Sequence, residues 1–150
     1  MEEKYLDEAI LEASYGVKMG HGGPFGAIIV DTDGKVISRG HNQVLVLNDP
    51  TAHAEIMAIR EACKKMGTYD LSGCTIYSSC EPCPMCLSAI IWSNIGTVFF
   101  GANRFDASKI GFRDEPIYEF FNGKNQILVT KDCNHSNCKR VLDEYKGEIY

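Results

Sequence analysis

The stretch SSCEPCPMC, residues 78–86, places three cysteines at equal intervals with two prolines among them. Because proline lacks a backbone N–H, Pro82 and Pro84 can stand in a helix only within its first turn, which predicts a helix that begins around Cys83. The preceding residues, CTIYSS at 74–79, have the β-branched and aromatic composition of a strand. We therefore expect a strand that turns directly into a helix, with a Cys-x-x-Cys pair in the first turns of that helix.

Helices and strands alternate on either side of this junction. Apolar spacing and turn signals predict helices at 3–19, 56–66, 83–92 and 137–145, a helix-like segment at 116–121, and strands at 25–31, 35–41, 74–79, 97–102 and 126–131. The long connection between the last two strands favours a parallel crossover over a hairpin. These elements indicate a single domain over residues 1–150 with a three-layer α/β/α fold. Its mixed five-stranded sheet, with the last two strands parallel, is covered on both faces by helices.

Composition restricts the location and the partners that we expect. The chain has 150 residues, seven cysteines and a formal net charge of −5. Its N-terminal residues are acidic, and no apolar run approaches the ~20 residues of a membrane span, so we expect no signal peptide, no membrane contact and a cytoplasmic location. In that reducing compartment, cysteines are more often free thiols or metal ligands than disulfides. Clusters of lysine and arginine are few, which favours a small substrate over nucleic acid.

The three cysteines of this stretch allow several kinds of site. A bacterial iron–sulfur run needs a fourth cysteine followed by proline, but Ile90 and Ile91 stand at those positions, which excludes it. The pair in CPMC, residues 83–86, is compatible with a redox dithiol, because a helix N-terminus lowers the pKa of a thiol. A purely structural zinc module is also compatible with the pair. The CPMC sequence by itself leaves the last two alternatives open.

A histidine upstream adds a catalytic zinc site to these alternatives. TAHAE at 51–55 opens one predicted helix, as PCPMC opens another. One histidine and two cysteines form a recognised ligand set for catalytic zinc, and His53, Cys83 and Cys86 would supply it. Glu55, two residues after the histidine, would act as a proton shuttle. The combination H-x-E followed by P-C-x-x-C is the signature of zinc-dependent nucleobase deaminases.

With these motifs the chain resembles the cytidine deaminase-like superfamily and, within it, the small bacterial guanine deaminases. The likeness is carried by GGPFGAIIV at 22–30, NDPTAHAE at 48–55, SSCEPCPMCLSAIIW at 78–92, DASKIGF at 106–112 and EIY at 148–150. The resemblance implies the cytidine deaminase-like fold and one Zn²⁺ per chain. It also implies hydrolytic deamination of guanine to xanthine and ammonia in purine salvage or catabolism. Cytosine, guanosine and tRNA adenosine are the alternative substrates of the same fold.

The resemblance also implies the roles of individual residues. Glu55 would take a proton from the zinc-activated water, deliver it to the ring nitrogen beside the amino-bearing carbon, and later protonate the departing ammonia. Asn42 would offer its amide to the base, and the Asp114 carboxylate would face the N–H edge of guanine. A homodimer is expected, with exchange of the C-terminal segment as one arrangement. The full set of implied substrate-binding residues is Asn42, Asp114, Phe25, Trp92, Ala54 and Tyr150.

The remaining cysteines and histidines are expected to have structural roles. Cys80 precedes the predicted helix and is expected to be a small buried residue beneath the site. The segment CNHSNC at 133–138 lacks a fourth ligand, which indicates that its two cysteines are ordinary thiols. His21 and His41 are expected at the surface or in turns.

Overall fold

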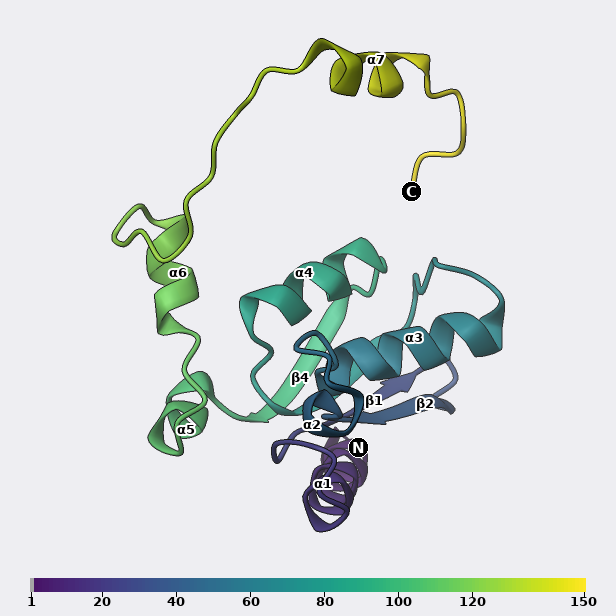
Figure 1. The fold of residues 1–150 in the computed structure, drawn as a ribbon. Coiled ribbons are helices and arrows are strands. Elements are labelled where there is room, and N and C mark those ends of the chain that lie inside the picture. The colour runs from purple at the N-terminus through teal and green to yellow at the C-terminus, as the bar shows by residue number, and fades with distance from the viewer. Residues whose placement is uncertain (1) are drawn as a thin grey trace. The chain divides into compact units, whose positions relative to one another are not determined.

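The structure is a computed structural model that describes residues 2–150. The chain separates into two compact units, one ending at Asp114 and the other comprising Glu115–Tyr150. All of the sheet belongs to the first unit (Figure 1). The prediction of one domain over residues 1–150 stays a prediction. Within residues 2–150, no helix combines the length and the apolar composition needed to cross a bilayer.

The first unit is built around a mixed four-stranded sheet in the order β2-β1-β3-β4. The strands are β1 (Gly26–Val30), β2 (Val36–His41), β3 (Thr75–Cys80) and β4 (Thr97–Ala102). β1 runs antiparallel to both β2 and β3, whereas β3 and β4 are parallel. The parallel pair directs the C-terminal ends of β3 and β4 to the same edge of the sheet, where α4 begins.

Helices cover both faces of this sheet (Figure 1). On one face α1 (Glu2–Lys18) packs through Tyr5 and Ala9 against Ile28 and Tyr77. On the other face α3 (Ala54–Met66) and α4 (Pro84–Trp92) enclose the larger core, whose buried members are Ala27, Ile29, Ala54, Ala58, Ala62, Leu71, Cys74, Ile76, Ile90 and Ile95. The predicted three-layer α/β/α arrangement is therefore present in the first unit.

A glycine brings α3 close to the sheet. A Cβ atom at Gly40 would overlap the carbonyl oxygen of Ala54 and lie 2.6 Å from the backbone nitrogen of Ala58. Only a residue without a side chain lets the helix approach this closely. The contact holds the first two turns of α3 against β2, and the N-terminal end of α3 carries His53 and Glu55.

Two short helices were not predicted from the sequence. α2 (Val44–Leu47) follows β2, and α5 (Arg104–Lys109) follows β4. α5 begins with a capping box, in which the Asn103 side chain accepts a backbone N–H from Asp106 and the Asp106 carboxylate accepts the N–H of Asn103. These helices are too short to show apolar periodicity, which explains why that criterion missed them.

The second unit corrects the predicted sheet. It contains α6 (Glu115–Phe121) and α7 (Ser136–Glu144), and the predicted fifth strand at 126–131 does not form, so the sheet has four strands. Ile127, Leu128 and Val129 in this segment are at least 60% exposed. Apolar composition alone does not make a strand, because the backbone groups need a partner strand. The parallel pair is therefore β3 with β4.

Candidate metal centre and active site

Two helix N-termini supply the candidate metal ligands. His53 is the N-cap of α3 and Cys83 is the N-cap of α4, both with extended backbone, and neither side chain caps its own helix. Cys86 lies in the first turn of α4, three residues after Cys83. Pro82 and Pro84 predicted a helix that begins at this point. The positive ends of both helix dipoles favour anionic sulfur at this place.

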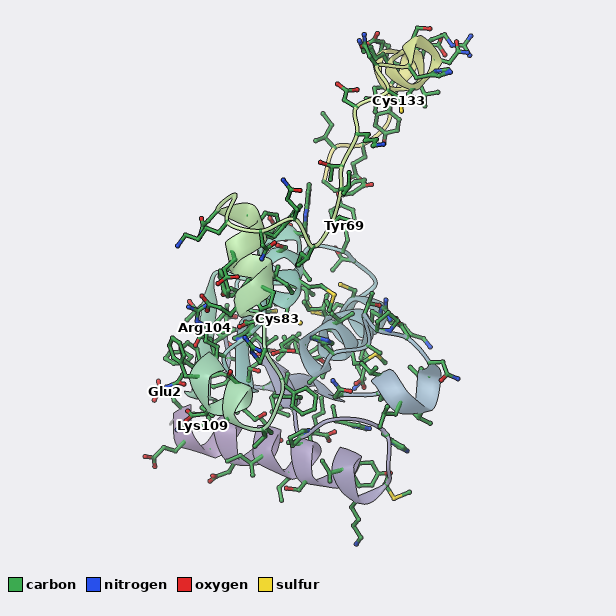
Figure 2. All side chains as sticks on the ribbon, turned by 60° about the vertical axis from the view of Figure 1, so that its left-hand side comes forward. Glu2, Tyr69, Cys83, Arg104, Lys109 and Cys133 are labelled. Carbon is green, nitrogen blue, oxygen red and sulfur yellow. The ribbon has the colours of Figure 1, made fainter. Side chains whose placement is uncertain are left out.

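The geometry of the three side chains fits a zinc ion. The Nδ1 atom of His53 lies 3.5 Å from the Sγ atoms of both Cys83 and Cys86. A tetrahedral zinc with ordinary Zn–N and Zn–S bonds requires N···S separations of about 3.6 Å. Among residues 2–150 this is the group of potential metal ligands whose donor atoms converge, all within 4.8 Å of one another. The position of Cys83 can be followed in Figure 2.

The two thiols differ in protonation. The Cys86 thiol donates a hydrogen bond to the Cys83 sulfur, and this bond, with one from His53, lowers the pKa of Cys83 to about 4 despite its burial. The same bond, together with burial and the Glu55 carboxylate, raises the pKa of Cys86. The bond to Cys83 also raises the pKa of His53. Without metal the pair therefore shares one proton, and metal binding would displace it.

Glu55 reaches the same centre from the first turn of α3. Glu55 is 6% exposed, and the Ser78 hydroxyl donates a 2.8 Å hydrogen bond to its Oε1 atom. Burial is the main cause that raises the pKa of this carboxyl, and the hydrogen bonds from its own backbone, Ser78 and Cys86 oppose the rise. In the interior of a helix, residues two apart would point to different sides. His53 is an extended N-cap, so it and Glu55 can converge.

Asn42, Phe25 and Asp114 each lie in a loop of the first unit. Asn42 is buried, its side-chain Oδ1 accepts the backbone N–H of Val44, and its backbone N–H donates to the carbonyl of Phe25. Phe25 packs edge-on against Phe112, with ring centroids 5.0 Å apart. Burial is the main cause that raises the pKa of Asp114, which is also sensitive to the charge of Cys83. Of these three residues, Asp114 lies close enough to a candidate metal ligand to respond to its charge, and the roles of all three toward a substrate stay predictions.

The other three predicted substrate residues are placed differently. Ala54 is fully buried between His53 and Glu55 and belongs to the core beneath α3. Trp92 is exposed at the C-terminal end of α4, about 13 Å along the helix axis from Cys83. Tyr150 lies in the second unit and is exposed there. Their roles toward a substrate stay predictions.

Several residues that shape the site are not apparent from motifs. The Glu81 carboxylate accepts the backbone N–H of Arg104, which ties the β3–α4 junction to the start of α5. Cys80 is buried, and its Sγ contacts the carbonyl oxygen of Asn103 at 3.6 Å, outside the group of metal ligands. Burial raises the pKa of Cys80 to about 11. This thiol therefore remains protonated and structural, as its position before the helix predicted.

A pair of histidines supports the loop that precedes Phe25. The His21 and His41 rings stack with centroids 5.1 Å apart, and His21 Nδ1 is hydrogen-bonded to His41 Nε2 at 2.8 Å. His41 Nδ1 lies 3.1 Å from the Glu12 carboxylate of α1. The expectation of surface or turn positions was incomplete, because the pair is partly buried and links α1 to the end of β2.

Comparison with known proteins agrees with this site. Residues 1–102 match the family described as the cytidine and deoxycytidylate deaminase zinc-binding region. The chain belongs to this family of zinc-dependent hydrolytic deaminases. Membership favours a zinc centre over a redox dithiol at CPMC, residues 83–86.

Three relatives within this family are similar to the chain. The guanine deaminase of Bacillus subtilis is 53% identical over 117 residues, covering 78% of this chain and 74% of that protein. Its crystal structure matches with a TM-score of 0.86 at 44% identity over 99% of this chain and 98% of that one. The tRNA-specific adenosine deaminase of Aquifex aeolicus is 46% identical over 101 residues, 67% of this chain and 66% of that protein. A protein crystallised with 2,6-diaminopurine matches with a TM-score of 0.73 at 33% identity, over 76% of this chain and 63% of that one.

Proposed function

We propose that this protein is a zinc-dependent guanine deaminase, which converts guanine and water to xanthine and ammonia. The metal centre and Glu55 define the reaction class, and the 53% identity with a guanine deaminase carries the choice of substrate. The relative crystallised with 2,6-diaminopurine supports a purine base as the ligand. The seven cysteines are all free thiols, which supports a reducing cytoplasmic location.

The chain supplies the zinc ligands and the proton shuttle. His53, Cys83 and Cys86 would hold the ion, which when bound acts as a Lewis acid and lowers the pKa of a water to about 7. Glu55 accepts the proton of the attacking water and transfers it to the ring nitrogen beside the amino-bearing carbon. It then carries the second proton to the amine, which leaves as ammonia. Because burial raises its pKa, this carboxyl holds a proton more readily than an exposed glutamate, which suits a group that must both accept and donate protons.

Base recognition is assigned to the loops around this carboxylate. The ring N–H and amino groups of guanine are donors, so an ionised Asp114 would accept hydrogen bonds from them. The Asn42 side chain, already oriented by its bond to Val44, would contribute a directional amide. Phe25 would cover one face of the base. Ala54 lies in the core beneath α3, and Trp92 is exposed about 13 Å along α4 from Cys83, so their contact with the base stays a prediction.

A homodimer with an exchanged C-terminal segment would supply Tyr150. The second unit has no buried residue in either helix, and it exposes Leu128, Val129 and Leu142. A unit of this size cannot bury a core of its own, so it needs another surface to pack on. We propose that a second copy of the chain provides this surface. Tyr150 at its end would then enter the site of the neighbouring subunit.

Subunit complementation tests this exchange. The Glu55→Gln variant keeps its C-terminal tyrosine, and the Tyr150→Ala variant keeps its carboxylate. If the segment is exchanged, mixed dimers contain one complete site, and co-refolded variants recover deaminase activity that neither has alone. An inactive mixture that is shown to contain mixed dimers would place Tyr150 in the site of its own chain, whereas a fully active Tyr150→Ala variant would place it outside both sites.

A substrate panel tests the proposed function. Ammonia release by zinc-replete protein is compared for guanine, guanosine, cytosine, adenine and an adenosine-containing tRNA anticodon stem. Guanine is expected to have the highest kcat/KM. Faster turnover of the tRNA substrate, with binding that weakens steeply as salt rises, would instead support the activity of the Aquifex aeolicus relative, although the net charge of −5 argues against it.

A further inference from the structure

Ser78 places a hydroxyl group inside the core of the first unit. It lies on β3, is 1% exposed, and occupies a sheet face that Ile76 otherwise fills with apolar surface. The next residue, Ser79, engages a different partner, because its hydroxyl accepts the backbone N–H of Gly26. A hydroxyl group in an apolar core is costly unless a partner satisfies it. The partner of Ser78 therefore indicates why a serine stands at this position.

That partner is the carboxylate of Glu55. The Ser78 Oγ atom donates to Oε1 at 2.8 Å, and both residues are buried. No polar side-chain atom buried within residues 2–150 is left without a hydrogen-bond partner, and Glu55 is also hydrogen-bonded by its own backbone and by Cys86. A glutamate side chain has several rotatable bonds, and holding one oxygen limits the positions that the other can occupy.

We propose that Ser78 is a positioning residue for the deamination reaction. It anchors Oε1 and thereby directs the second carboxylate oxygen of Glu55 toward the transferred proton. Ser78 keeps its own hydrogen throughout, and the proton moves only between water, Glu55 and the base. This inference rests on the proposed role of Glu55. The anchoring residue lies on β3, outside the loops that are proposed to bind the base.

A positioning role and a purely structural role of Ser78 predict different effects of its replacement on kcat. If Ser78 only stabilised the fold, its replacement would lower the melting temperature without changing turnover. If it orients the proton shuttle, kcat falls while KM and zinc content hold. Loss of a group that orients a catalytic residue typically costs 10- to 100-fold in activity, so we expect a decrease in kcat of about that size.

The chain offers a matched control. Ser38 on β2 is also fully buried, and its hydroxyl donates at 2.8 Å to the backbone carbonyl of Ala58, which belongs to the same helix as Glu55. Ser38→Ala therefore removes an equivalent buried hydrogen bond to α3 without touching the carboxylate. Ser78→Thr retains a hydroxyl at the anchoring position and is the conservative rescue variant.

The kinetic experiment uses the base that the wild-type protein deaminates fastest. Ser78→Ala should lower kcat about 10- to 100-fold with KM within about twofold and one zinc per chain, and Ser78→Thr should recover most of the loss. Ser38→Ala should lower the melting temperature and keep kcat. Wild-type kcat in Ser78→Ala, or an equal loss in Ser38→Ala, would overturn the inference.

A spectroscopic experiment on zinc-free protein supplies a second readout. The carbon-13 resonance of the Glu55 carboxylate is assigned by its absence in Glu55→Gln. Ser78→Ala should shift this resonance, whereas Ser38→Ala should leave it in place, and an unshifted resonance in Ser78→Ala would refute the anchoring. If Glu55→Gln still turns over substrate, the proposed function fails in its mechanism. If Glu55→Gln is inactive and Ser78→Ala is fully active, only the role of Ser78 fails.

Discussion

Individual replacement of the three cysteines of the stretch 78–86 should separate metal binding from packing. His53 Nδ1 lies 3.5 Å from the sulfur atoms of Cys83 and Cys86, whereas Cys80 contacts a backbone carbonyl at 3.6 Å and is outside the group of converging ligands. We therefore expect Cys83→Ala and Cys86→Ala to lose zinc. Cys80→Ala should keep one zinc per chain.

The expected loss of zinc affinity is roughly 100-fold larger for Cys83→Ala or Cys86→Ala than for Cys80→Ala. Structural zinc sites with four ligands bind with an apparent free energy of about 10–16 kcal/mol, which is roughly 3 kcal/mol per ligand. Loss of Cys83 or Cys86 should therefore weaken zinc binding roughly 100-fold. Loss of the buried Cys80 sulfur removes packing only, so unfolding should become easier by about 1 kcal/mol and the melting temperature should fall by about 2–4 °C.

Competition with a chromophoric chelator measures these differences. Each variant is equilibrated with zinc and graded chelator, and the zinc dissociation constant is compared with that of the wild type, while thermal unfolding is followed separately. Cys80→Ala should match the wild type within about twofold in zinc affinity, against the roughly 100-fold change at Cys83. If Cys80→Ala loses zinc as severely as Cys83→Ala, the assignment of ligands is wrong.

Three further predictions follow from the site and from the packing of α3. In zinc-free protein, iodoacetamide should modify the Cys83 thiol in preference to the other thiols as pH is lowered toward 5, because its pKa of about 4 keeps it ionised there, and mass spectrometry of the peptides would show this. Base binding should weaken as pH falls through the raised pKa of Asp114, since the ionised carboxylate offers two acceptor oxygens and charge-assisted bonds to the N–H groups of guanine, and protonation turns one of those oxygens into a donor. Asp114→Asn should therefore raise KM and remove the contribution of this carboxyl to the acid limb of kcat/KM, while the contribution of Glu55, whose pKa is also raised, should remain. Gly40→Ala should destabilise the first unit by about 1–3 kcal/mol, because the new Cβ overlaps α3 backbone, whereas Gly96→Ala, which meets no atom within 4 Å, should have little effect in chemical denaturation.

The local signals in the sequence predicted the elements that carry the metal site. Pro82 and Pro84 indicated where α4 begins, and the structure places Cys83 at its N-cap. The apolar spacing of 56–66 likewise identified α3 up to Gly67, which adopts the left-handed conformation of a helix C-cap. These signals are reliable because capping and proline effects act within one turn and do not depend on tertiary contacts.

Features that depend on pairing across the fold could not be predicted in this way. The segment 126–131 has strand-like composition, but it has no partner strand in the structure, and composition does not reveal a missing partner. The hydrogen bond between Ser78 and Glu55 joins residues on different elements, and the stacking of His21 on His41 joins a loop to a strand. A polar residue at an inward position of β3 was the available signal for Ser78.

Glu55, beside a zinc ion, is the proposed proton shuttle in the deamination of guanine. The most direct measurement is xanthine formation from guanine by zinc-loaded wild type and Glu55→Gln, with zinc content determined on the same samples. We predict about one zinc per chain in both proteins and equimolar xanthine and ammonia from the wild type. We predict that Glu55→Gln loses nearly all turnover. Comparable xanthine formation by Glu55→Gln, or no xanthine from zinc-loaded wild type, would contradict the account.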